Sequence, residues 1–116
     1  MSATAAVPYG IMRDVTHPSI EEIRQRKRWV LSVMAEQGGD RLNLPPRDQP
    51  YTCPCCFHPT LRYRGGLGYC KECDWEDDGQ DDHNADVVIG GPNGSDSLTV
   101  ARRRYRDLHG LPPLNL

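Results

Sequence analysis

The chain has 116 residues, a length that suits one domain, and 37% of them are hydrophobic while 26% are charged. This composition allows only a thin apolar core, of the kind that a bound metal ion or disulfide bonds often stabilise. A net charge of −2 gives no overall basic character, and the longest apolar stretch, residues 29–35, is too short to cross a bilayer.

The cysteine count indicates a reducing compartment. Five cysteines, an odd number, argue against the disulfide framework of a small secreted domain. Residues 1–7 lack the basic start and the long hydrophobic run of a signal peptide. We therefore expect a soluble, cytoplasmic protein with reduced thiols and no membrane association.

The N-terminal part, residues 1–50, is predicted to hold an arm, one helix and a proline-rich linker. Residues 1–17 have the composition of a poorly ordered arm. Ser19, followed three residues later by Glu22, has the spacing of a capping box, and Gly38-Gly39 can end the helix, which we place at about 19–37. The helix carries an imperfect apolar stripe, formed by Ile20, Ile23, Val30, Leu31 and Met34. In the linker at 39–50, Leu42 and Leu44 are candidates to pack on the following domain.

Two C-x-x-C pairs dominate the middle of the chain. Cys53 and Cys56 form the first pair, and Cys70 and Cys73 form the second, with thirteen residues between the pairs. Zn²⁺ prefers four soft ligands in a tetrahedron, and each tight turn can supply two thiolates. The spacing predicts one structural zinc ion that is held by all four cysteines and has no open position for chemistry.

Other uses of these cysteines fit the sequence less well. Iron in a rubredoxin-like site needs the same ligands. A thioredoxin-type redox pair requires a βαβ frame, and a zinc deaminase requires an H-x-E motif; the sequence shows neither. Cys55 is expected to be buried beside the site. His58 is expected to lie near the metal without binding it, although a role as ligand stays open.

The segment between the cysteine pairs has the pattern of a hairpin. Residues 60–64 alternate like a strand, residues 65–68 are rich in glycine, and Tyr69 is expected to start a short return strand. We therefore predict a small α+β fold: a zinc ribbon with two C-x-x-C turns on a short hairpin, flanked by an N-terminal and a C-terminal helix. The ribbon and the last helix would occupy residues 51–110, followed by a tail at 111–116.

A long acidic loop is predicted at 76–96. Residues 74–86 carry seven carboxylates and no lysine or arginine. Such clustering is unfavourable unless cations offset it, either on this chain, at Arg102 to Arg106, or on a protein partner; a solvated loop is the third possibility. Candidate partner-binding residues are Glu76, Asp77, Asp78, Asp81 and Asp82. Within the loop, residues 87–89 could form a short strand or an apolar plug.

A last helix is expected after Ser97, which can cap its N-terminus, and before Gly110. Its predicted apolar face consists of Leu98, Ala101, Tyr105 and Leu108. Its arginines are alternative phosphate-binding candidates, together with two arginines of the hairpin: Arg102, Arg103, Arg104, Arg106, Arg62 and Arg64. A sequence pI of about 6.0 and the acidic loop argue against nucleic-acid binding, so a solvated helix face is the favoured interpretation.

Four motifs in order resemble the cysteine-rich CPCC family of small bacterial proteins. They are Tyr-Thr-Cys-Pro-Cys-Cys at 51–56, Cys-Lys-Glu-Cys-Asp-Trp-Glu-Asp-Asp-Gly at 70–79, Gly-Gly-Pro-Asn-Gly-Ser-Asp-Ser-Leu at 90–98 and Ala-Arg-Arg-Arg-Tyr at 101–105. The resemblance covers about 51–106 and implies a zinc-ribbon-like metal site. The chain departs from the family pattern at Asp74, where glycine is usual, and in the longer acidic loop that includes residues 87–89.

The sequence offers no nucleophile–base pair and no phosphate loop, so we do not expect an enzyme. The leading hypothesis is a protein-binding module, in one version an inhibitor or immunity-type protein whose acidic loop blocks a basic cleft. A nucleic-acid-associated zinc ribbon that uses Arg102 to Arg106 is the first alternative. A structural zinc domain within a larger assembly is the second. The sequence does not identify the partner or the oligomeric state.

Overall fold

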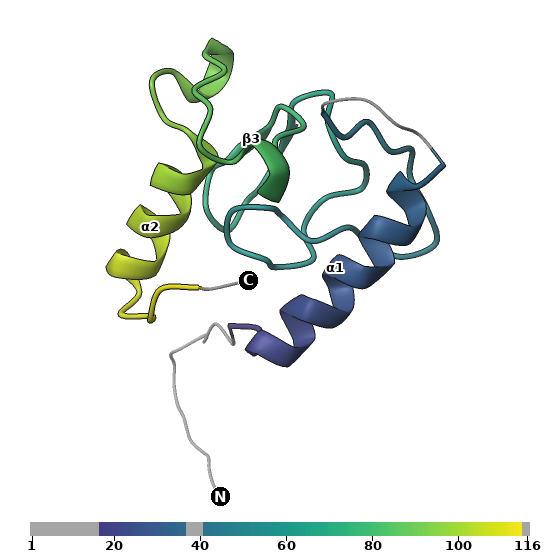
Figure 1. Cartoon of the computed structure of the whole chain (residues 1–116), viewed down its shortest axis with the longest axis horizontal. Coiled ribbons are helices and arrows are strands. Elements are labelled where there is room, and N and C mark those ends of the chain that lie inside the picture. Colours follow the sequence, from purple (N-terminus) through teal and green to yellow (C-terminus); the bar gives the residue numbers. More distant parts are fainter. Residues whose placement is uncertain (1–16, 37–40, 115–116) are drawn as a thin grey trace, which may run out of the picture.

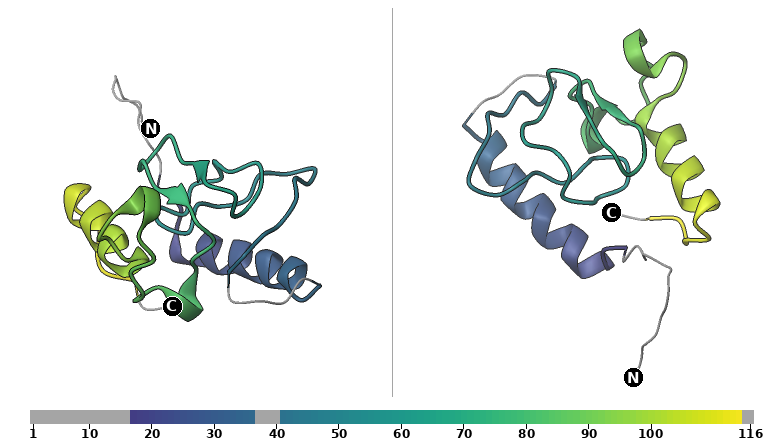
Figure 2. Two further views of the ribbon diagram at one scale, coloured as in Figure 1. Left: turned by 90° about the horizontal axis from the view of Figure 1, so that it is seen from above. Right: turned by 180° about the vertical axis from the view of Figure 1, so that it is seen from behind.

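The computed structural model describes residues 17–36 and 41–114. Along these residues the elements are α1 (Ile20–Met34), β2 (Gly68–Tyr69), β3 (Glu76–Asp77), the 3-10 turns η2 (Asp82–Asn84) and η3 (Gly91–Asn93), and α2 (Leu98–Leu108). Figure 1 and the view from behind in Figure 2 show α1 and α2 on opposite sides of a middle segment that consists mostly of loops. Two helices and a small antiparallel sheet fit the predicted small α+β class. Neither helix in the described ranges combines the length and the apolar character that a membrane span requires.

Helix α1 begins with the predicted capping box. The Ser19 hydroxyl accepts a hydrogen bond from the Glu22 amide at 3.1 Å, and the Glu22 carboxylate accepts one from the Ser19 amide at 2.9 Å. The helix ends at Met34 with Ala35 as its C-cap, before the predicted end at residue 37. The expected glycine stop and the N-terminal arm up to residue 16 lie outside the described residues.

The buried face of α1 differs from the predicted stripe. Ile23, Val30 and Val33 are buried, whereas Ile20 and Leu31 are exposed to 37% and 59%. The prediction that placed Leu31 on the apolar face was therefore wrong, and Val33 was missed. Residues 23, 30 and 33 share one side of a helix with 3.6 residues per turn, and Leu31 is one residue further round the axis, toward solvent.

The sheet pairs β2 with β3, so the predicted hairpin between residues 60–64 and Tyr69 is wrong. Gly68 lies opposite Asp77 and Tyr69 opposite Glu76, and the second C-x-x-C turn connects the two strands. Residues 60–64 run beside other segments instead, through antiparallel bridges from Leu61 to Tyr51 and from Arg64 to Leu44. Positive φ angles at residues 65–67 turn the chain sharply, which separates the 60–64 segment from β2.

One hydrophobic core unites the N-terminal part with the rest of the chain. Leu42 and Leu44 are buried, as the sequence predicted, and they share the core with Val30 and Val33 of α1, with the buried cysteines and with α2. The Leu42 amide donates to the Gly79 carbonyl at 2.9 Å. The helix and the described part of the linker, residues 17–36 and 41–50, are therefore packed against the cysteine-containing unit.

The C-terminal segment follows its prediction in part. Ser97 caps α2 by accepting a hydrogen bond from the Val100 amide at 3.1 Å, and Leu98, Ala101 and Tyr105 are buried. Leu108, the last residue of α2, is 78% exposed, so its place on the predicted apolar face was wrong. Residues 87–89 form neither a strand nor a plug, since Val87 and Val88 are more than half exposed.

Candidate metal centre

The two C-x-x-C turns have the same backbone construction. In the first turn, the Phe57 amide donates to the Cys53 carbonyl at 2.8 Å, and the Cys53 amide donates to the His58 carbonyl at 2.8 Å. In the second turn, the Asp74 amide donates to the Cys70 carbonyl at 2.8 Å, and the Cys70 amide donates to the Trp75 carbonyl at 2.9 Å. The two turns are therefore related by an internal repeat of hydrogen bonds.

The repeat explains the residue that follows each pair. Phe57 and Asp74 occupy equivalent positions and have φ angles of +67° and +68°, in the left-handed region. Glycine adopts this region without steric cost, whereas side chains other than those of Asn and Asp adopt it less readily. Asp74 therefore suits the position where the family usually has glycine.

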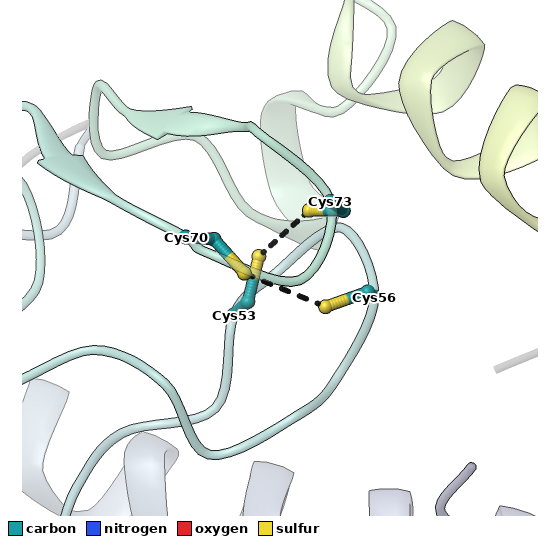
Figure 3. A group of neighbouring side chains, drawn as sticks. All are labelled: Cys53, Cys56, Cys70 and Cys73. Atoms are coloured by element: carbon teal, nitrogen blue, oxygen red, sulfur yellow. Dashed lines mark hydrogen bonds between the residues drawn. The ribbon is translucent and has the colours of Figure 1, made fainter. Parts of the chain in front are cut away.

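The turns bring four sulfur atoms together. The Sγ atoms of Cys53, Cys56, Cys70 and Cys73 all lie within 4.8 Å of one another. Figure 3 shows the four side chains pointing toward a common centre, with the two contacts that cross between the turns: Cys53 to Cys73 at 3.6 Å and Cys56 to Cys70 at 3.7 Å. A tetrahedral zinc ion with bonds of about 2.3 Å holds its sulfurs about 3.8 Å apart, so these residues fit a bound metal ion.

Contacts among the four sulfurs shift the pKa values of the cysteine thiols in opposite directions. Contact with the Cys53, Cys56 and Cys73 thiols lowers the pKa of Cys70, and the Thr60 hydroxyl lies 3.0 Å from its sulfur. Contact with the Cys53 and Cys70 sulfurs raises the pKa of Cys56. Thiolates crowded this closely repel one another, and a divalent cation removes that repulsion.

Cys55 and His58 are buried near the site, with exposed fractions of 3% and 8%. The Cys55 amide donates to the Cys53 sulfur at 3.4 Å, but the Cys55 thiol is not one of the four converging sulfurs. Trp75 is buried in the same core as the cysteines. The structure thus places all four predicted ligands together and keeps Cys55 beside them.

A second buried polar cluster is centred on Arg64, which is only 1% exposed. Its guanidinium contacts Asp77 at 2.7 Å and Asp81 at 3.0 Å, and it donates to the Gln80 carbonyl at 3.0 Å. The Asp77 carboxylate also accepts hydrogen bonds from the Gly65 and Gly79 amides, at 2.6 and 3.0 Å. Burial opposes the charge, but Asp77 and Asp81 raise the pKa of Arg64.

These ion pairs continue to the surface. Lys27 of α1 contacts Asp81 at 3.8 Å and Asp82 at 2.7 Å, and Arg102 of α2 contacts Asp82 at 2.8 Å. Both cations lie over the Phe57 ring, 4.9 and 5.2 Å from its centroid. Although burial opposes it, the hydrogen bond and charge of Lys27, with Arg102, lower the pKa of Asp82. We call this series the ion-pair chain; its members, in order, are Asp77, Arg64, Asp81, Lys27, Asp82 and Arg102.

This arrangement changes the roles that were predicted for the acidic loop. Asp77 and Asp78 are 0% and 8% exposed, so the partner-binding role proposed for them does not fit their burial. Asp81 and Asp82 are paired within the chain. Glu76 is half-buried in β3, where its backbone pairs with the Asn93 side chain. Three of the carboxylates, Asp77, Asp81 and Asp82, are offset by cations of this chain, mainly by Arg64 and Lys27, which the sequence reasoning did not assign to them.

The arginines proposed to bind phosphate differ in their contacts and in their exposure. Arg64 is buried, which rules out contact with a nucleic-acid backbone. Arg102 donates to the Pro54 carbonyl at 2.8 Å as well as to Asp82. Arg104 forms a two-bond pair with Asp96 at 2.8 and 3.0 Å, and Arg106 donates to the Pro112 carbonyl. Arg62 and Arg103 remain exposed.

Comparison with known proteins supports the resemblance read from the motifs. The model of the cysteine-rich CPCC family matches residues 51–111, just over half of the chain, which extends the predicted region of 51–106 by a few residues. No curated protein and no solved structure gave a significant match. The matched region contains both C-x-x-C turns, Arg64, its two carboxylate partners and α2. The chain therefore belongs to the cysteine-rich CPCC family.

Proposed function

We propose that this protein is a non-catalytic zinc-binding module that presents a rigid surface to a protein partner. The observation that carries the proposal is the closed set of four sulfurs, because four protein ligands complete the coordination of a tetrahedral zinc ion and leave no position for a substrate. Zinc is favoured over iron because it needs no redox partner and is the usual ion of paired C-x-x-C turns.

The surface we assign to the partner is the tip next to the second cysteine turn. Leu67 and Tyr69 are 51% and 57% exposed there, and Tyr63, at 37%, covers Gly66 and Gly68. Tyr69 belongs to β2 and Leu67 to the turn before it, and this stretch of chain leads directly into the metal ligand Cys70. Exposed apolar groups on a rigid support are typical of protein interfaces.

The test compares matched surface variants. The protein isolated from its own host is examined by native mass spectrometry for a bound protein, as wild type, as L67N/Y69S and as L108S. Asparagine is chosen at position 67 because it tolerates the positive φ of Leu67. We expect a partner with wild type and with L108S, and none with L67N/Y69S. The assignment of this surface is wrong if wild type carries no partner or if both variants lose the partner equally.

A further inference from the structure

The two cysteine turns share one hydrogen-bond construction but differ in burial. Residues 53–57 of the first turn are all buried, whereas the residues on either side of Cys73 in the second turn are exposed. Cys73 itself is half-buried, and it is the only one of the four metal-binding cysteines that is not buried. The second turn therefore exposes one ligand of the centre to a small reagent from solvent.

We propose that the centre is a redox switch in which a hydroperoxide oxidises Cys73, a disulfide forms between Cys73 and Cys53, and the loss of both ligands releases the metal ion. The inference rests on the zinc centre of the proposed function and adds a mode of regulation to it. Redox-sensor cysteines are accessible to solvent and lie next to a second cysteine that resolves the oxidised form. Cys73 meets both conditions.

Cys53 is the partner that the geometry favours. Its Sγ lies 3.6 Å from the Cys73 Sγ, in a contact that crosses between the two turns (Figure 3). The sulfurs of a disulfide are about 2.05 Å apart, so the two atoms need to approach by about 1.5 Å. The disulfide would keep the two turns joined after the ion has left.

The reaction consumes one hydroperoxide and two thiolates. With hydrogen peroxide, the Cys73 thiolate attacks one oxygen; the S–O bond forms, the O–O bond breaks, and hydroxide leaves and takes up a proton. The Cys53 thiolate then attacks the sulfur of the Cys73 sulfenic acid; the S–S bond forms, the S–O bond breaks, and a second hydroxide leaves and takes up a proton. The two thiolates lose two electrons in total, which reduce the peroxide to two molecules of water.

The other three ligands are shielded from the first step. Cys53, Cys56 and Cys70 are exposed to 0%, 2% and 0%. The Thr60 hydroxyl also donates to the Cys70 sulfur at 3.0 Å, which lowers the nucleophilicity of that sulfur. The first attack is therefore expected at Cys73, and the buried Cys53 reacts only with the sulfenic acid that forms beside it.

The second turn also connects the metal centre with the surface assigned to the partner. Tyr69 precedes Cys70, and the Tyr69 hydroxyl donates a hydrogen bond to the carboxylate of Asp74, which follows Cys73. The same turn joins β2 to β3. Oxidation takes both cysteines of this turn off the metal, so it changes the support of Leu67 and Tyr69.

The experiment uses the untagged full chain, loaded with one equivalent of zinc. Hydrogen peroxide is added in steps, a chromogenic chelator records the released zinc, and mass spectrometry of peptides from the unreduced protein identifies the disulfide. We expect one zinc ion to be released for each Cys53–Cys73 disulfide formed, and a thiol reductant with fresh zinc should restore the loaded protein. Zinc retained at peroxide concentrations that oxidise free glutathione overturns the inference, as does a different first disulfide. A chain that binds no zinc before peroxide is added would contradict the zinc centre itself, and the inference with it.

A matched pair of ligand substitutions tests which sulfur reacts first. Cys73→His and Cys56→His each replace one thiolate by an imidazole, which also binds zinc but cannot form a disulfide. The zinc content before peroxide is added shows whether each variant is loaded. We expect Cys73→His to release zinc roughly tenfold more slowly than wild type or slower still, and Cys56→His to release it at about the wild-type rate. Equal rates in the two loaded variants overturn the inference.

Trapping of the sulfenic acid in wild type gives a reading that needs no substitution. Dimedone, which labels sulfenic acids, is present during a brief exposure to peroxide, and the labelled peptide is identified by mass spectrometry. The first label is expected on Cys73. A first label on Cys53, Cys56 or Cys70 contradicts the order of oxidation that the burial of the ligands predicts.

Discussion

The four-cysteine centre and the ion-pair chain are two buried polar clusters in one small core. The cysteine ligands come in two local pairs, each held by its own turn, and the sulfurs meet within 4.8 Å. The ion-pair chain consists of single residues from α1, from residues 64–82 and from α2. Its carboxylates range from the fully buried Asp77 to the half-exposed Asp82. The first cluster fits a cation from outside, whereas the second supplies its own cations.

The difference teaches how a domain with few large apolar residues can hold its segments together. The cysteine centre fixes two turns relative to each other, and the ion-pair chain ties both helices to the segment that follows the second turn. A buried ion pair often adds little net stability, but removal of one partner is costly because the other charge remains buried. Substitutions in the two clusters should therefore destabilise the protein in different ways.

Loss of the metal should have the largest effect. Cys70→Ser removes a ligand at which the other sulfurs and the Thr60 hydroxyl converge, so we expect loss of the zinc ion and unfolding of residues 51–80. Structural zinc in small domains contributes on the order of 10 kcal/mol of apparent binding free energy. Circular dichroism and metal analysis measure the change. Cys55→Ser is the matched control and should keep both the ion and the fold; loss of the ion in that variant would contradict the assignment of ligands.

Arg64→Met should have the next largest effect. It leaves the Asp77 carboxylate buried with only backbone donors, so we expect a loss of about 3–5 kcal/mol in the free energy of unfolding. Denaturant unfolding at a fixed free zinc concentration measures it, since bound metal shifts the apparent stability. Arg62→Met, two residues earlier and exposed, should change stability by less than about 0.5 kcal/mol. Equal effects of the two substitutions would show that the buried ion pair has no special cost when broken.

Gly65→Ala tests the turn that delivers Arg64 to its partners. A methyl group there would lie 2.4 Å from the Leu42 carbonyl oxygen, at a residue with a φ of +76°. The left-handed conformation alone costs about 1–2 kcal/mol for a side chain, and the clash adds to it. Gly91→Ala has a similar φ of +66° but open space around it. We expect Gly65→Ala to destabilise the protein by about 1–3 kcal/mol more than Gly91→Ala in the same unfolding assay; similar losses would show that the approach to Leu42 is not tight.

Asp82→Asn should have the smallest effect, and one that depends on pH. The pKa of Asp82 is lowered in the folded protein, so its contribution to stability is present above the unfolded pKa of about 3.9 and is lost as the pH falls through the lower folded value. Its side chain is 48% exposed, so we expect a difference from wild type of less than about 1 kcal/mol at pH 7.

The same measurement at lower pH gives the sign of that effect. The difference between wild type and Asp82→Asn should shrink below about pH 4, because Asp82 of wild type then becomes neutral as well. Both proteins are expected to lose metal in acid to the same extent, so the comparison removes that contribution. The control is Asp48→Asn, because Asp48 is an exposed carboxylate that does not belong to the ion-pair chain. A difference that grows toward low pH would contradict the ion pairs with Lys27 and Arg102.

The two clusters also differ in how far they could be predicted. The C-x-x-C spacing identified the four cysteines because both ligands of each pair lie on one turn, and the Ser19–Glu22 spacing predicted the start of α1 for the same local reason. The burial of Arg64 could not be predicted, because it depends on Asp77 and Asp81, which reach it only after the 65–67 turn has separated residues 60–64 from β2. The one available signal was the excess of carboxylates at 74–86 with no lysine or arginine among them.

The predicted strand pairing was wrong for a related reason. The alternation over residues 60–64 predicted a strand, but the segment bends at residues 62 and 63 and pairs only through single bridges at Leu61 and Arg64. Alternation also does not say which neighbour a segment pairs with. Leu61 pairs with Tyr51 and Arg64 pairs with Leu44, whereas the prediction paired this segment with Tyr69. Both observed partners precede the first cysteine pair.

X-ray absorption spectroscopy at the zinc K-edge, on protein loaded with one equivalent of zinc, tests the central claim most directly. It reports the number and type of atoms bound to the ion. We predict four sulfur atoms at about 2.3 Å and no nitrogen or oxygen in the first coordination shell. A shell of three sulfurs with one nitrogen or oxygen would contradict the closed four-cysteine centre, and with it the argument that the ion is structural.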